Sequence, residues 1–170
     1  MKTNRLFWNS IIAVVLLCNI GCDQISKTIV RSHLNFHEQI NLFDNRVMLT
    51  RVENSGAFLS LGDSLSSGVK FTVLIFIPFL SLLAGLYFLF SKSALSRSTL
   101  VALSFVVGGG IGNIMDRYLY GSVTDFLHID FGILRTGIFN MADVSIMTGV
   151  FIIVGTYLVR RNNPLMGMEP

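Results

Sequence analysis

Four long apolar runs limit what this chain can fold into. They cover residues 6–29, 69–90, 100–118 and 142–159. The hydrocarbon core of a bilayer is about 30 Å thick, and about 20 helical residues cross it. Only 14% of the residues are charged, whereas about a quarter are charged in an ordinary soluble domain. The sequence therefore predicts an integral membrane protein with four transmembrane helices.

Basic residues indicate which helix ends face the cytoplasm. The short segments before the first run, between the second and third runs, and after the fourth run hold Lys2, Arg5, Lys92, Arg97, Arg160 and Arg161. The two longer connections, 31–68 and 119–141, carry basic residues that are more dilute and are mixed with acids. By the positive-inside rule, both termini are expected in the cytoplasm and the longer connections on the outer side.

The outer connections carry strand signals. Residues 38–43 and 47–52 form two short runs around Asp44-Asn45, a pair suited to a hairpin turn. Residues 121–129 predict one more strand. At this length we expect a single domain, 1–170. The predicted fold class is therefore an all-α membrane protein with four transmembrane helices and a small β-rich extracytoplasmic cradle.

Several functional classes fit the composition poorly. The net charge of +3 is spread without a basic block, so nucleic acid is not an expected partner. The three His and two Cys residues lack zinc spacing, and we expect no metal or cofactor. Cys18 and Cys22 are expected to be buried free thiols. The segment from Asn19 to Cys22 looks like the end of a lipoprotein signal, but three further apolar runs favour a retained helix.

Polar residues gather at the outer ends of the apolar runs, where unpaired polar groups are costly. They are Asp23, Gln24, Lys27, Asn113, Asp116, Arg117, Asn140 and Asp143, joined by Asn54 in the first outer connection and Asp125 in the second. With the topology above, all of them lie near one depth, at the outer interface. The sequence thus predicts one polar site at one face of the bilayer.

Structural roles are open for the residues of the first and third runs. Asp23 and Lys27 are four apart, the spacing of an intrahelical ion pair. Gly108 and Gly112 form a Gly-x-x-x-Gly pattern, which lets helices approach closely. Asn113 is suited either to an interhelical hydrogen bond or to a contact with a substrate backbone.

The remaining polar residues also have structural alternatives. Asp116 and Arg117 fit a charge pair at a helix end, where Arg reaches the interface. Asn140 fits an N-cap of the fourth helix, with Asp143 as an acid in its first turn. The segment that starts at Asn54 is also suited to a simple turn.

Asp125 and Asp143 favour a functional site when they are taken together. They are 18 positions apart, on either side of a connection that returns to the same membrane face. Two carboxyl groups held close together share one proton, because both cannot ionise easily. One group then accepts a proton from water while the other donates one, which is the chemistry of aspartic peptide hydrolysis. His128 stands alone, and no Ser or Cys nucleophile beside a His base is evident.

Five motifs stand in order along the chain: Asp23 to Lys27 (DQISK), Asn54 to Phe58 (NSGAF), Gly108 to Arg117 (GGGIGNIMDR), Val123 to Phe126 (VTDF) and Phe139 to Asp143 (FNMAD). In these motifs the chain resembles the lipoprotein signal peptidases (signal peptidase II), which are bacterial intramembrane aspartic peptidases. The resemblance covers nearly the whole chain. The departures are Gly110 for a common Ala, Thr124 for a usual apolar residue, and Cys22 before the first motif; none touches the two aspartates.

The resemblance implies roles for particular residues. Asp125 and Asp143 would be the catalytic pair. The residues that would bind substrate or support the site are Asn54, Gly56, Asn113, Arg117, Asn140, Asp23, Lys27 and Asp116. The implied substrate is a prolipoprotein whose lipobox cysteine carries a diacylglyceryl group, cut just before that cysteine at the outer side of the bacterial inner membrane. Membrane lipids and globomycin-type peptide inhibitors are the other implied partners.

Other interpretations remain open at this stage. A small ion-coupled transporter would also place Asp and Asn within membrane helices, although such carriers favour the midplane and internal repeats. A structural assembly subunit would use polar helix ends to hold a partner, whereas nothing in this sequence requires one and a monomer is expected. For the peptidase, Phe58 is expected to close over the substrate as part of a lid.

Overall fold

Four helices long and apolar enough to cross a membrane occur in the described part of the chain, as the apolar runs predict. The computed structural model describes residues 2–57, 62, 64–91 and 95–162, with side chains from residue 5 onward. The helices are α1 (Lys2–His33), a continuous helix made of α2 (Ser67–Phe71), η2 (Thr72–Phe76) and α3 (Ile77–Ser91), then α4 (Arg97–Tyr120) and α5 (Met141–Asn162). The chain is therefore a multi-pass membrane protein.

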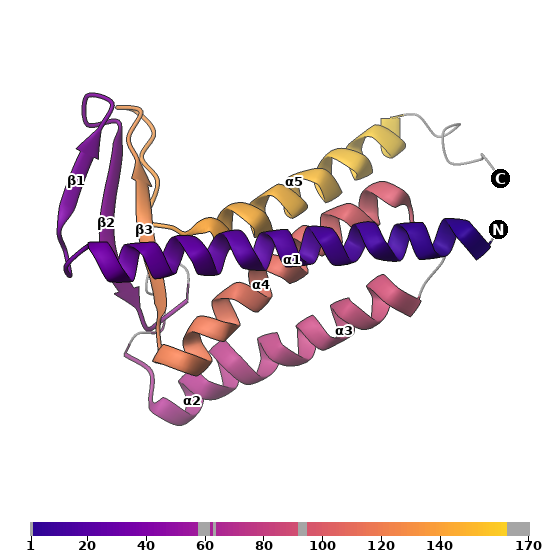
Figure 1. Cartoon of the computed structure of the whole chain (residues 1–170), viewed down its shortest axis with the longest axis horizontal. Coiled ribbons are helices and arrows are strands. Elements are labelled where there is room, and N and C mark those ends of the chain that lie inside the picture. Colours follow the sequence, from indigo (N-terminus) through magenta and orange to yellow (C-terminus); the bar gives the residue numbers. More distant parts are fainter. Residues whose placement is uncertain (1, 58–61, 63, 92–94, 163–170) are drawn as a thin grey trace.

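Helix α4 lies at the centre of the bundle and packs against α1, α3 and α5 (Figure 1). Glycines allow these close approaches. A Cβ atom added at Gly149 of α5 would lie 2.5 Å from the carbonyl oxygen of Ala102 in α4. One added at Gly108 of α4 would lie 3.0 Å from Cβ of Asn19 in α1. Close packing of this kind drives helix association in lipid, where apolar side chains gain little by leaving the acyl chains.

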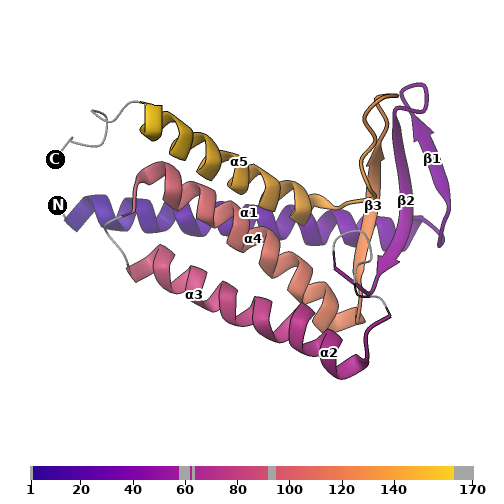
Figure 2. The same cartoon turned by 180° about the vertical axis from the view of Figure 1, so that it is seen from behind.

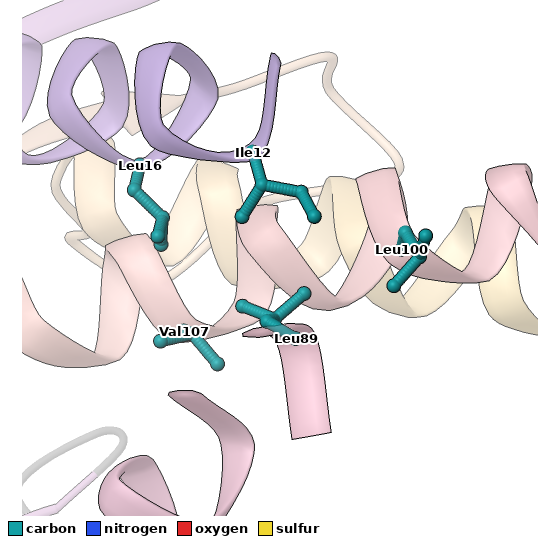
Figure 3. Close-up of a cluster of buried hydrophobic side chains, with 5 residues drawn as sticks. All are labelled: Ile12, Leu16, Leu89, Leu100 and Val107. Atoms are coloured by element: carbon teal, nitrogen blue, oxygen red, sulfur yellow. The ribbon is translucent and has the colours of Figure 1, made fainter. Parts of the chain in front are cut away.

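An apolar cluster joins three helices in the half of the bundle far from the strands. It contains Ile12 and Leu16 of α1, Leu89 of α3, and Leu100 and Val107 of α4 (Figure 3). Branched side chains from three helices pack against one another there, and all five are apolar. The buried charged side chains of the described residues, Asp23, Lys27, Asp116 and Asp125, lie nearer the sheet.

Much of the helix surface is apolar and exposed, as a surface that faces lipid should be. Cys18 and Cys22 lie on it as free thiols. The prediction that these thiols are buried is therefore wrong. Helix α1 turns one face to the bundle, the face that carries Ile12, Leu16 and Asp23, and positions 18 and 22 are rotated away from that face by the 3.6-residue period.

A three-stranded antiparallel sheet lies at one end of the bundle, in the order β1 (Gln39–Leu42), β2 (Val47–Asn54), β3 (Val123–Ile129). Figures 1 and 2 show that the start of α1 and the end of α5 lie at the opposite end. The sheet contains the predicted hairpin and the predicted third strand. Its first turn holds Phe43, Asp44 and Asn45 at φ 51, 54 and 64°, a left-handed conformation that Asp and Asn tolerate well.

The second membrane helix changes its winding near the sheet. η2 forms a π-helical segment between α2 and α3, and Pro78 follows it. Proline cannot donate a backbone hydrogen bond, and single π turns often occur at functional sites. Val73, Leu74 and Pro78 from this stretch border the cavity described below.

The close contact at Gly149 predicts a site-specific loss of stability. Gly149→Ala should lower the free energy of unfolding by about 1–3 kcal/mol, because the new methyl group meets backbone atoms of α4 that cannot move aside. Gly155→Ala is a matched control in the same helix, since a Cβ there meets nothing within 4 Å. Thermal unfolding in detergent measures both variants. Equal stability of the two would contradict this packing account.

Candidate active site

A cavity of about 370 Å³ opens between the sheet end of the bundle and η2. Its polar lining consists of Asn54, Asn113, Arg117, Asp125, Asn140 and Asp143, and its apolar lining includes Val73, Leu74, Pro78, Ile138 and Ile146. Six of the residues that the sequence predicts thus surround one space. The apolar wall from η2 and α3 was not predicted, because an apolar residue in a membrane helix carries no sequence signal for a cavity.

Asn140 holds both aspartates. It immediately precedes α5, and its Oδ1 accepts a hydrogen bond of 3.0 Å from the backbone N–H of Asp143, while the Asp143 carboxylate accepts one of 3.2 Å from the backbone N–H of Asn140. This reciprocal pair is a capping box, which satisfies free N–H groups at a helix start. The Asn140 side-chain amide also donates to Asp125 Oδ1 at 2.6 Å. The predicted N-cap is therefore present, and it links the two carboxyl groups.

Asp125 lies on β3 and is almost fully buried, at 5% exposure. Its second carboxylate oxygen accepts a hydrogen bond of 3.0 Å from the Asn54 amide at the end of β2. Burial raises the pKa of Asp125 from 3.8 to about 6; the charge of Asp143 acts in the same direction, and the hydrogen bonds from Asn54 and Asn140 oppose it. A carboxyl group with such a pKa keeps its proton more readily than an ordinary aspartate.

Asn113 connects Asp143 to a buried lysine. The Asn113 amide nitrogen donates to Asp143 Oδ1 at 2.9 Å, and its oxygen accepts from Lys27 Nζ at 3.0 Å. An ammonium group can only donate, so it must face the amide oxygen. Lys27 thereby sets the orientation of the amide and directs its N–H₂ group toward Asp143.

Buried charges behind the cavity join four elements. Lys27 Nζ lies 2.8 Å from Asp23 Oδ2 and 3.3 Å from Asp116 Oδ2, with all three side chains fully buried. Asp23 Oδ1 accepts from the backbone N–H of Ala142 in α5, and Asp116 accepts from the backbone N–H of Thr124 in β3. The predicted ion pair of Asp23 and Lys27 is present, and these three residues brace the cavity without lining it.

Gly112 makes room for this charge cluster. A Cβ atom at this position would lie 2.5 Å from Asp23 Oδ2. The carbonyl oxygen of Gly112 also accepts a hydrogen bond of 3.2 Å from the side chain of Gln24. In the Gly-x-x-x-Gly pattern, Gly108 therefore allows close helix packing, and Gly112 leaves space for the Asp23 carboxylate.

Arg117 connects the cavity to the first outer connection. One guanidinium nitrogen donates to the carbonyl oxygen of Gly56 at 2.9 Å, and the backbone N–H of Gly56 donates to Asn54 Oδ1 at 3.1 Å. The predicted turn at Asn54 is therefore present and also faces the site. The Nε atom of Arg117 is buried and has no hydrogen-bond partner within the residues that the structure describes. Phe58, the predicted lid residue, lies outside those residues.

Arg31 is a supporting residue that sequence analysis missed. Its guanidinium lies 2.8 Å from Asp116 Oδ2, donates to Thr124 Oγ1 at 2.8 Å, and stacks 4.0 Å from the centre of the Tyr120 ring. The available signal was periodicity, because Arg31 follows Lys27 by four positions on the same face of α1. Thr124, which departs from the usual apolar residue, is thereby part of the network.

The fold and the cavity define a multi-pass membrane protein that holds two linked aspartates at one end of its helices, an arrangement suited to an intramembrane aspartic peptidase. The model of the family Signal peptidase (SPase) II matches residues 13–159. The chain therefore belongs to the signal peptidase II family and is a peptidase. This assignment gives no support to the transporter alternative.

Relatives of known name agree with the family assignment. The chain is 30% identical over 145 residues to a lipoprotein signal peptidase of Streptococcus pneumoniae, covering 85% of this chain and 90% of that protein. It is 32% identical over 158 residues to a lipoprotein signal peptidase of Gloeothece citriformis, covering 91% of this chain and 89% of that protein. A solved structure described as a bacterial membrane enzyme superposes with a TM-score of 0.80 at 27% identity, over 91% of each chain. The similarity thus extends over nearly the whole fold.

The raised pKa of Asp125 predicts how stability depends on pH. The folded chain binds this proton more tightly than the unfolded chain does, so the contribution to stability is complete below pH 3.8 and is lost as the pH rises through about 6. The shift from 3.8 to about 6 corresponds to about 3 kcal/mol. Raising the pH from 5 to 8 should therefore lower the stability of the intact chain more than that of Asp125→Asn. Thermal unfolding at each pH measures the difference. Identical pH dependence in the two proteins would contradict the raised pKa.

Proposed function

We propose that this chain removes the signal peptide from prolipoproteins whose lipobox cysteine carries a diacylglyceryl group, and that it cuts the peptide bond just before that cysteine. The observation that supports this function best is the placement of Asp125 and Asp143 in one cavity, each hydrogen-bonded to Asn140. Two carboxyl groups joined in this way suit the hydrolysis of a peptide bond by water.

Asp125 and Asp143 are the proposed catalytic residues, with different protonation at rest. Asp125 is the proposed proton donor, because its pKa, raised to about 6, lets it bind a proton more readily than an ordinary aspartate. Asp143 accepts a proton from water as the water oxygen bonds to the carbonyl carbon, and Asp125 passes its proton to the carbonyl oxygen. The C–N bond then breaks, the amine takes the proton from Asp143, and one hydroxyl group of the intermediate returns a proton to Asp125. Both residues end in their starting states.

The amide and guanidinium groups around the cavity are the proposed peptide contacts. Asn54, Asn113, Arg117 and Asn140 line the same space as the aspartates. The Nε of Arg117, which has no partner among the described residues, leaves one donor for a substrate carbonyl oxygen. Gly56 holds Arg117 in place through its carbonyl oxygen. Asp23, Lys27 and Asp116 have a supporting role, since they lie behind the cavity and tie α1 to α4, α5 and β3.

The cavity also has a suitable position along the bundle for a lipidated substrate. It lies at the sheet end, whereas Arg5, Arg97, Arg160 and Arg161 belong to the opposite helix ends (Figure 1); Lys92 lies outside the described residues. By the positive-inside rule, this arrangement supports a topology with both termini in the cytoplasm and the cavity at the outer face of the inner membrane. A diacylglyceryl group in the outer leaflet would hold its cysteine at that depth.

We extend the proposal to other molecules that share this site. Outer-leaflet lipids would compete with the diacylglyceryl chains along the apolar wall of the cavity. A globomycin-type peptide would occupy the polar end and block the aspartates. We propose that the monomer carries out catalysis with Asp125 and Asp143 as its acid and base.

The proposed roles predict the effect of isosteric substitutions. Asp125→Asn and Asp143→Asn should each lower cleavage of a diacylglyceryl lipobox peptide by at least about 100-fold, because neither amide takes part in acid–base chemistry. Substrate binding should persist, since the shape of the cavity is kept. A detergent assay with purified chain measures cleavage, and fluorescence anisotropy of a labelled peptide measures binding.

Asp130→Asn is the matched control for these variants. Asp130 lies in the same connection but pairs with Arg135 on the surface, so its substitution should leave cleavage nearly unchanged. Near-normal turnover by either Asp125→Asn or Asp143→Asn would exclude the proposed pair. Loss of activity in all three variants would show that the substitutions act on the fold of the connection instead.

A further inference from the structure

The turn that joins β3 to α5 exposes an unusual amount of apolar surface. Residues 130–135 form its tip, in which Ile133 is 99% exposed, Leu134 73% and Phe131 67%. These side chains lie outside the membrane-spanning helices. Contiguous apolar side chains in contact with water are unfavourable and mark an interaction surface.

Several backbone N–H groups of this tip are hydrogen-bonded within the chain. Four consecutive N–H groups have partners: those of Asp130, Phe131, Gly132 and Ile133 donate to Arg46 O, Leu134 O, Asp130 Oδ1 and Phe131 O at 2.7–3.0 Å. Unpaired backbone groups prevent ordinary loops from entering lipid. Pairing of these four N–H groups lowers the cost of moving the tip into the interface.

The segment that follows the tip borders a groove beside the lipid-facing surface of α5. A groove of about 580 Å³ lies between the segment that returns from the tip and α5, and it is lined by residues 135–139, Asp143, Val144, Met147, Thr148 and Phe151. Met147 and Phe151 are exposed on a helix that spans the membrane. In Figures 1 and 2, β3 is the strand nearest the helices, and the end of the sheet that carries this turn extends sideways beyond the start of α5.

The charged residues of the tip do not favour binding to acidic lipid headgroups. Arg135 pairs with Asp130 at 3.0 Å, so the two charged groups of the tip balance each other. Attraction to acidic headgroups would require unpaired basic residues. The surface is therefore suited to the glycerol and upper acyl region of the bilayer, whatever the headgroup charge.

We propose that the tip 130–135 is an interfacial anchor, whose side chains Phe131, Ile133 and Leu134 insert into the outer leaflet beside α5. The anchored segment joins Asp125 to Asp143, so insertion holds both residues at a constant depth relative to the lipid surface. The anchor rests on the membrane topology and does not depend on the reaction assigned to the aspartates.

Tryptophan fluorescence tests the anchor directly. Trp8 is the only tryptophan of the chain, so Ile133→Trp in a Trp8→Phe background reports on the tip alone. The full chain is reconstituted in phosphatidylcholine vesicles that contain lipids brominated either near the glycerol or near the terminal methyl group. The anchor lies about 5–10 Å into the interface, so the shallow bromine should quench the emission by about half and the deep bromine less. Replacing some of the lipid with phosphatidylglycerol should not change the result.

Two further variants make the outcome decisive. Asn41→Trp, in the same background, is the control on the exposed edge strand β1; it should be quenched by aqueous acrylamide and not by brominated lipid. Leu134→Trp repeats the measurement if Ile133→Trp folds poorly. Acrylamide quenching of both tip variants without lipid quenching would overturn the anchor. Emission that changes with the protein-to-lipid ratio would also overturn it, because the tip would then contact another copy of the chain. Neither readout requires peptidase activity.

Discussion

A lysine ammonium group with no exposure to solvent determines much of this structure. Lys27 lies in a membrane helix, where a charge without a partner would be prohibitively costly. Asp23 and Asp116 stabilise it, and each of these carboxylates also accepts a backbone N–H from another element, α5 in one case and β3 in the other. The need to pair one cation thus fixes the positions of α1, α4, α5 and β3 together.

The same cluster gives the cavity its polarity. Lys27 orients the Asn113 amide, and that amide donates to Asp143. On the other side, Asn54 and Asn140 donate to Asp125, which is buried in β3 and has a pKa raised to about 6. The two carboxyl groups therefore meet different surroundings within one cavity. Such a difference is what an acid and a base need if they are to act in the same reaction.

The sequence predicts the parts of the fold that depend on local chemistry. Apolar runs predict the four membrane helices, Asp44-Asn45 predicts the hairpin turn, and Asn140 predicts the cap of α5. Features that depend on tertiary packing were missed. Cys18 and Cys22 face outward because only one side of α1 meets the bundle, and the role of Arg31 arises only because β3 and α4 lie against it. The prediction that Asp125 and Asp143 lie in one site relied on their order in the chain, whereas the part of Asn140 in joining them required coordinates.

Infrared difference spectroscopy between pH 5 and pH 8 tests most directly whether Asp125 carries the proton of this site. The account predicts a carbonyl band of a protonated carboxyl group that disappears with a midpoint near the pKa of Asp125, about 6, and that is missing from the spectrum of Asp125→Asn. A band that persists unchanged in Asp125→Asn would place the proton elsewhere and would contradict the account.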